Sequence, residues 1–223
     1  MPGYRMMRDL LRSYGFMHCA ATIYKYMVEL GLRSVVRRKK PGYKRGNANK
    51  TFPNLLNQNF DVDAPNKIWC TDFTYLYLAD GTTRYNCTII DLHDRIVLAS
   101  LNGSQITASL AIEALKIAIK RHKPDKGLIL HSDQGSQFTS KEFNDFCSNA
   151  CIQQSMSRAG CPYDNAPMER YYNTLKNEHT NLFSFKSKEN LDHSVNDFAY
   201  GWYNHVRPHT YNGGRTPAAA RVA

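Results

Sequence analysis

Apolar, aromatic and β-branched residues are concentrated in three short runs between residues 67 and 103. The runs read KIWCTDFTYLYL (67–78), RYNCTIIDL (84–92) and IVLASLNG (96–103). Such residues favour strands, and a turn-forming stretch, Ala79-Asp80-Gly81, separates the first run from the second. We therefore expect an antiparallel meander of three strands.

The pattern changes to a helical period after residue 105. In ITASLAIEALKIAIKRH (106–122) apolar residues recur every three or four positions, which predicts an amphipathic helix. Pro124 and Gly127 end it, and the apolar run GLILHSD (127–133) predicts a short buried strand. A helix at 140–150, a strand at 152–157, a loop at 158–167 and a mainly helical segment from Met168 complete the order. This order predicts an α/β fold, a mixed sheet flanked by helices.

Two short helices are expected before this region, within residues 4–31. The first ends near Gly15, and the second places Ile23, Met27 and Leu30 on one face before Gly31. Two helices joined by a short glycine-containing turn resemble part of a helix-turn-helix module. Residues 33–50 are basic, contain Pro and Gly, and show little periodicity, as in a linker or a DNA-binding arm.

Charge is distributed unevenly over these segments. The chain has a net charge of +10, and residues 1–50 alone carry 12 Lys or Arg against two acids, so the remainder is neutral. A basic arm before a neutral body is typical of a protein that binds the phosphate backbone of DNA. The arm residues expected to contact DNA are Arg37, Arg38, Lys39, Lys40, Lys44 and Arg45.

We divide the chain into three parts: a partial helix-turn-helix with its basic arm (1–50), a catalytic core (51–180) and a helical tail packed on that core (181–223). No apolar run approaches the roughly 20 residues that span a bilayer. The first residues also lack the apolar centre of a signal peptide. The sequence therefore predicts a cytoplasmic protein without a membrane partner.

Three acidic residues occupy positions from which they could converge. Asp72 lies within the first predicted strand, Asp133 directly follows the strand 127–132, and Glu169 lies in the first turn of a helix. Strand ends and helix starts on one side of a sheet can meet in a single crevice. Three carboxylates in such a crevice repel one another unless cations neutralise them, and Mg²⁺ prefers oxygen ligands. The pattern predicts a site for two Mg²⁺ ions, suited to phosphodiester chemistry.

The words around these acids resemble a known family. Asp72, Asp133 and Glu169 match the D…D-x35-E arrangement of retroviral integrases and related transposases, with 35 residues between Asp133 and Glu169. The surrounding sequence is similar to the second-reading-frame (OrfB) transposases of bacterial insertion sequences. The matching stretches are NLLNQNF (54–60), PNKIWCTDFTYL (65–76), HSDQGSQF (131–138), SMSRAGCPYDNAPMERYYNTLKNE (155–178), YNHVRPH (203–209) and GGRTPAAA (213–220).

This resemblance, which covers about residues 4–220, implies a ribonuclease-H-like integrase core that cuts and joins DNA ends with Mg²⁺ or Mn²⁺. It implies that Lys176, seven residues after Glu169, lies near substrate DNA, and Asn165 is also expected to contact DNA. It further implies a multimer on paired element ends. The chain begins inside the family's helix-turn-helix region, so we expect a truncated recognition module and an upstream-frame (OrfA-type) helix-turn-helix subunit as a partner.

Other interpretations remain open at the level of sequence. A non-catalytic repressor derived from a transposase would be expected to lack one of the three acids, and a ribonuclease-H-like nuclease would use the same metals without joining strands. Tyr171 and Tyr172 near HVRPH (205–209) suggest a tyrosine recombinase, which would give Asp72 and Asp133 no role. Asp91 is a further strand-end acid, which we interpret as structural. His131 is compatible with a role beside Asp133 or with an ordinary buried histidine.

The charge distribution yields a first prediction. Deleting residues 1–50 should make the slope of log affinity for non-specific DNA against log salt less steep, because fewer counterions are released on binding. The measurement compares the full and shortened chains over the same salt series. An unchanged slope would place the phosphate contacts on the remainder of the chain.

Overall fold

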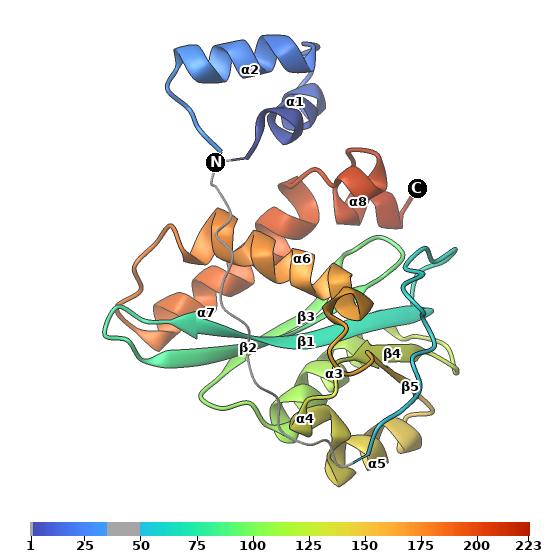
Figure 1. Ribbon diagram of the computed structural model, residues 1–223. Helices are drawn as coiled ribbons and strands as arrows, with labels where there is room; N and C mark the ends of the chain where they lie inside the picture. The colour runs from blue at the N-terminus through green and yellow to red at the C-terminus, as the bar shows by residue number, and fades with distance from the viewer. Residues whose placement is uncertain (1, 35–49) are drawn as a thin grey trace.

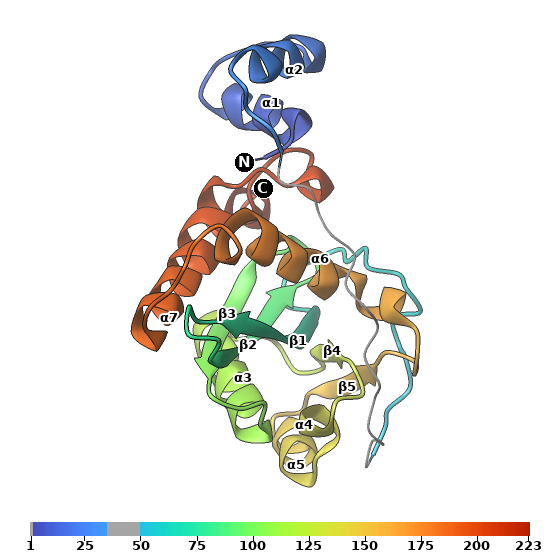
Figure 2. The ribbon, with the colours of Figure 1, turned by 60° about the vertical axis from the view of Figure 1, so that its left-hand side comes forward.

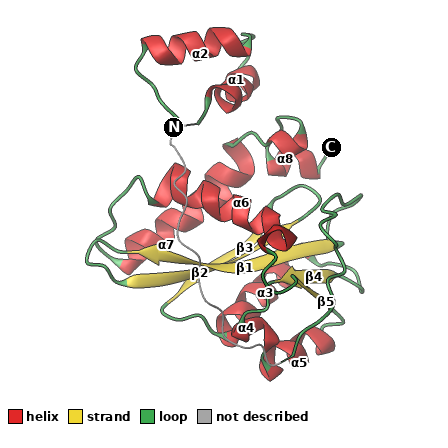
Figure 3. Cartoon of the chain, viewed as in Figure 1, coloured by secondary structure: helices red, strands yellow, loops and turns green. Residues whose placement is uncertain are grey.

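A five-stranded sheet forms the centre of the molecule (Figures 1 and 3). The structure is a computed structural model that describes residues 2–34 and 50–223. The strand order is β3-β2-β1-β4-β5. The strands are β1 (Ile68–Tyr77), β2 (Thr83–Asp91), β3 (Val97–Gly103), β4 (Ile129–Ser132) and β5 (Gln153–Met156).

The sheet is mixed, as the order of sequence patterns predicts. β1, β2 and β3 form the expected antiparallel meander. Through helical connections, β4 joins β1 in parallel and β5 joins β4 in parallel. β1 pairs with β2 from Trp69 to Tyr77, but it pairs with β4 only from Ile68 to Cys70. The long central strand therefore extends beyond its short parallel neighbour.

Helices cover both faces of the sheet, as the two views show (Figures 1 and 2). Along β1, Trp69 belongs to the core on one face and Cys70 to the core on the other, and both are fully buried. This alternation follows from the two-residue period of a strand. The helices of the Trp69 face are α3 (Ala108–His122), α4 (Ser136–Thr139) and α5 (Lys141–Asn149); those of the Cys70 face are α6 (Ala166–Leu175), α7 (Lys188–Asn196) and the π-helix η3 (Asp197–Val206).

The N-terminal helices α1 (Tyr4–Ser13) and α2 (Ala20–Glu29) pack against each other. Ile23 and Met27 are buried as expected, but Leu30 is 71% exposed. The prediction for Leu30 is wrong because α2 ends at Glu29, so Leu30 is its C-cap and no longer follows the helical face.

Residues after α6 return to the sheet and close the structure. They form η2 (Lys176–Thr180), η4 (Thr210–Asn212) and α8 (Pro217–Arg221), in addition to α7 and η3. Arg221 donates to Asp91 Oδ2 at 3.1 Å and to Asp94 Oδ2 at 2.8 Å, and both carboxylates are almost fully buried. The backbone N–H of Asn66 also donates to Asp91 Oδ2. This network ties the C-terminal helix to the β2–β3 turn.

Within the two described ranges, no helix is long and apolar enough to cross a membrane.

The buried network around Asp91 yields a stability prediction. Asp91→Ala should lower the free energy of unfolding by about 3 kcal/mol, because it breaks a buried ion pair with Arg221 and leaves the backbone N–H of Asn66 without its acceptor. Asp63→Ala is the matched control, since its ion pair with Lys67 is solvent-exposed and should contribute less than about 1 kcal/mol. Urea unfolding of the three proteins measures both values. Equal losses in the two variants would show that the network does not stabilise the fold.

Candidate active site

The register of the sheet places Asp72 and Asp133 side by side. Cys70 of β1 pairs with His131 of β4, and this is the last parallel pair between the two strands. Asp72 and Asp133 each lie two positions further along, where the strands stop pairing. Because side chains alternate along a strand, Asp72 lies on the same face as Cys70, the face that α6 covers. A backbone N–H orients each carboxylate, that of Phe73 at 2.7 Å and that of Gly135 at 2.8 Å.

Glu169 reaches the same region from α6. Three inward side chains hold this helix on the sheet, because Met168, Tyr172 and Leu175 are buried in the core of that face. The hydroxyl of Tyr172 donates to the carbonyl of Asp72 and accepts from the N–H of Thr88. At the start of α6, the amide of Asn165 donates to the carbonyl of Thr71 at 3.3 Å. Both bonds fix α6 to the segment of β1 that carries Asp72.

The pKa of Asp72 depends in part on the charges of the other two acids. Burial, then the charges of Asp133 and Glu169, raise the pKa of Asp72 to about 8, while the Phe73 N–H and Lys176 partly oppose the shift. Burial also raises the pKa of Glu169. The structure thus brings together the three predicted acids, and Lys176 is close enough to affect Asp72. Burial is the largest cause of the raised pKa of Asp72, and the charges of Asp133 and Glu169 add to it.

The three carboxylates suit a hard divalent cation, although they do not lie close enough together to coordinate one without moving. Carboxylate oxygens are what Mg²⁺ and Mn²⁺ prefer, and a cation would remove the repulsion that raises the pKa of Asp72. Across residues 2–34 and 50–223, no group of three or more His, Cys, Asp or Glu side chains lies close enough to hold a metal ion as it stands.

The predicted DNA-contacting residues have different positions. Lys176 is half-buried beside the acids, at the junction of α6 and η2. Asn165 is only 5% exposed, and its contact with Thr71 is that of an anchoring residue, so its contact with DNA stays a prediction. Six arm residues lie outside the described residues: Arg37, Arg38, Lys39, Lys40, Lys44 and Arg45.

A polar network that the sequence did not reveal shapes the loop before α6. Asp164 is fully buried, accepts two bonds from the guanidinium of Arg158 at 2.9 and 3.0 Å, and accepts a third from Gln58 at 2.8 Å. These bonds, those from Arg158 first, hold the pKa of Asp164 well below its usual range. The sequence pattern could not predict this contact, because Gln58 lies 106 positions away from Asp164 along the chain.

The competing catalytic residues are engaged in the fold. Tyr171 and Tyr172 are buried beneath α6, so neither can attack a phosphate. Arg207 of the HVRPH segment makes a two-bond ion pair with Glu178. His131 is fully buried between two serine hydroxyls, and burial lowers its pKa to about 4, so it is an ordinary neutral histidine. Asp91 has the structural role described above.

The chain is similar to proteins of known family. Two family models, both described as an integrase core domain, match residues 62–162 and 150–217. The chain is 35% identical over 202 residues to the transposase for insertion sequence element IS904 of Lactococcus lactis, covering 90% of this chain and 79% of that one. It is 33% identical over 216 residues to transposase InsF for insertion sequence IS3A of Escherichia coli, covering 96% and 75%.

Solved structures share the fold. The HTLV-2 integrase catalytic core domain in complex with magnesium has a TM-score of 0.55 and 23% identity, covering 71% of this chain and 97% of that one. A chain of the simian T-cell lymphotropic virus intasome has a TM-score of 0.62 and 20% identity, covering 96% and 74%. At these identities the likeness concerns the fold, which is that of ribonuclease H.

The fold and the three converging acids define an integrase-core enzyme that acts on DNA. Within that class, the chain belongs to the DDE transposases of bacterial insertion sequences. The assignment to the OrfB subtype stays a prediction.

The raised pKa of Asp72 yields a prediction about stability without metal. The Asp72 carboxyl keeps its proton to about pH 8 when folded, against about 3.8 when unfolded, so the free energy of unfolding should fall as pH rises between these values. Asp72→Asn should reduce this fall, and Asp63→Asn, an exposed control, should not. Thermal melting in EDTA at pH 5, 6.5 and 8 measures the slope. Identical slopes in all three proteins would contradict the electrostatic strain at Asp72.

Proposed function

We propose that this transposase cuts and joins DNA at the ends of its element with Asp72, Asp133 and Glu169 as ligands of two Mg²⁺ ions. The observation that carries the proposal is the convergence of the three acids, which the register of β1 and β4 and the attachment of α6 bring together. Burial, then the charges of Asp133 and Glu169, raise the pKa of Asp72 to about 8. A site that concentrates negative charge on a DNA-cutting fold is suited to bind cations rather than to remain empty. Asp72, Asp133 and Glu169 together would hold the ions, whose charge would offset the repulsion between the three carboxylates.

The chemistry would proceed in two transfers at phosphorus. When bound, the ions would activate the attacking oxygen and stabilise the leaving one. A water oxygen first attacks a phosphodiester at the element end, and the bond to the 3′ oxygen breaks to leave a 3′-hydroxyl. That hydroxyl then attacks a phosphodiester of the target DNA, forming a new phosphodiester bond while the target strand's own 3′ oxygen leaves as a hydroxyl. No protein–DNA covalent bond forms, consistent with the burial of Tyr171 and Tyr172.

Lys176 would position the DNA at this site. Its ammonium affects Asp72 from the end of α6, so it lies at the edge of the acidic cluster. A lysine there can neutralise a phosphate next to the scissile bond and fix its distance from the acids. The basic arm would add affinity that does not depend on sequence.

We further propose that the enzyme works in the cytoplasm as a multimer on paired element ends, with a helix-turn-helix subunit from an upstream frame. The fold relative from simian T-cell lymphotropic virus is described in an intasome, which supports multimerisation by analogy. A non-catalytic remnant is disfavoured because all three acids are present and converge. Hydrolysis without joining is disfavoured because the curated relatives are transposases.

The catalytic assignment is tested by three isosteric variants. Asp72→Asn, Asp133→Asn and Glu169→Gln should each reduce Mg²⁺-dependent nicking to a few per cent of the parent or less, because each removes one ligand charge. Non-specific DNA binding should change little, because the arm is untouched. The matched control is Asp63→Asn, which alters an exposed acid outside the site and should leave nicking unchanged. Any of the three that retains substantial nicking activity would not belong to the site.

A further inference from the structure

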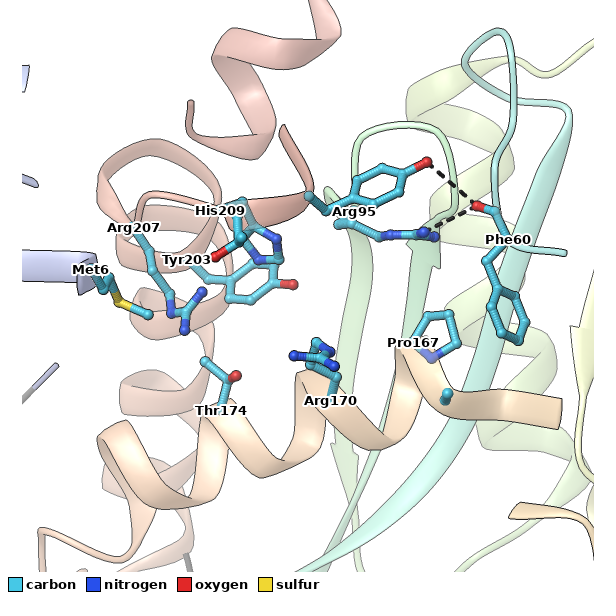
Figure 4. A pocket seen from close by; sticks show the side chains of 12 residues that line it. Met6, Phe60, Arg95, Pro167, Arg170, Thr174, Tyr203, Arg207 and His209 are labelled. Atoms are coloured by element: carbon cyan, nitrogen blue, oxygen red, sulfur yellow. Dashed lines mark hydrogen bonds between the residues drawn. The ribbon is translucent and has the colours of Figure 1, made fainter. Parts of the chain in front are cut away.

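A cavity of about 470 Å³ lies beside α6 (Figure 4). With roughly 100° between successive helical residues, Glu169 and Lys176 share one flank of α6, while Pro167, Arg170 and Thr174 share the other. The figure shows the last three side chains rising from the same side of the helix into the cavity. The opposite wall comes from Phe60, Arg95, Tyr203, His209 and Tyr211.

The cavity is electropositive. Arg95, Arg170 and Arg207 line it, and its lining contains no Asp or Glu. An ion pair with Glu178 offsets the positive charge of Arg207. Arg170 is exposed and has no ion pair with any described acid. The exposed Asp61 acts on Arg95 from outside the lining. A net positive charge therefore faces the cavity.

Two buried polar atoms in this wall have no hydrogen-bond partner among the residues that the structure describes. They are Nη1 of Arg95 and Nε2 of His209, whose side chains belong to residues that are 8% and 7% exposed. The same guanidinium donates through Nη2 to the carbonyl of Phe60 and lies 3.9 Å from the ring centroid of Tyr211, so its orientation is fixed. The guanidinium nitrogen can only donate, whereas Nε2 of His209 donates or accepts according to the tautomer of the ring. An unsatisfied buried donor is costly, and the free N–H of Arg95 in a cavity wall indicates a ligand that accepts hydrogen bonds.

Resting on the function proposed above, we propose that this cavity binds one nucleotide of a DNA strand outside the catalytic centre. The phosphate contacts Arg95 and Arg170, and the sugar and base lie against the wall that Phe60, Pro167 and Tyr211 form. The volume exceeds what a lone phosphate fills and falls within the range of small-molecule sites. Arginine is the favoured partner of phosphate, and aromatic rings are the favoured surface for a base.

The proposal also explains why one helix separates the two sites. DNA that meets Glu169 and Lys176 on one flank of α6 would place a neighbouring nucleotide across the start of the helix, at Arg170. The N-terminal end of a helix carries partial positive charge, and Ala166 and Pro167 at that end line the cavity. The bound nucleotide would fix the strand on both sides of the catalytic helix.

The test uses the full chain without divalent metal and three probes: thymidine 5′-monophosphate, inorganic phosphate and thymidine. The nucleotide should bind at least about tenfold more tightly than either part, and Arg170→Glu should weaken it by about tenfold or more. Lys126→Glu is the matched control, because Lys126 is an exposed cation on the α3–β4 connection, and it should leave nucleotide affinity within about twofold. Calorimetric titration gives the affinities.

Duplex DNA supplies the second measurement. Arg170→Glu should lower the salt slope of DNA binding by about one, and Lys126→Glu should not. No nucleotide binding by the parent chain, or equal losses in both variants, would overturn the proposal. Asp72→Asn should bind the nucleotide as the parent does. Failure of the catalytic assignment would appear as nicking by Asp72→Asn, whereas failure of the cavity would appear as unchanged nucleotide affinity in Arg170→Glu.

Discussion

The attachment of α6 to β1 is the contact on which the site depends. A strand that extends beyond its parallel neighbour leaves backbone groups in a buried region, and such groups need partners. The Tyr172 hydroxyl and the Asn165 amide bind the carbonyls of Asp72 and Thr71. The same bonds fix the position of α6 along β1, and with it the position of Glu169 relative to Asp72. A helix held only by apolar contacts could slide, and the third carboxylate would then move away from the first two.

This rigid anchoring holds together groups that repel one another. Proteins commonly retain local destabilisation at functional sites when the surrounding structure is strong enough to maintain it. Here the two cores on either side of the sheet provide that strength. The strain is electrostatic rather than conformational, since it depends on protonation and on counterions. Negative charge on these side chains therefore opposes folding, whereas the cation binding proposed for them requires it.

Much of the fold could be predicted because its signals are local. The three strands of the meander, α3, α5 and the short parallel strands all follow from periodicity and turn residues, and the ends differ by a few positions at most. The acids were identifiable because D-x35-E spacing is itself a sequence property. The partners of Asp164 and Arg207 were not, because Gln58 and Glu178 are joined to them only by the tertiary fold. The burial predicted for Leu30 was wrong for a different reason, because the end of a helix is set by its capping residues and not by the spacing of its apolar residues.

The contacts of Arg221 also bear on how the protein folds. They join residues 127 and 130 positions apart, and the core beneath α6 is completed by Phe198 and Tyr203. Such long-range closure slows folding and leaves apolar surface open until the later segments have been made. A nascent chain that already contains all three acids would therefore still lack the packing that aligns them. Synthesis and DNA cutting are thus separated in time by the topology itself.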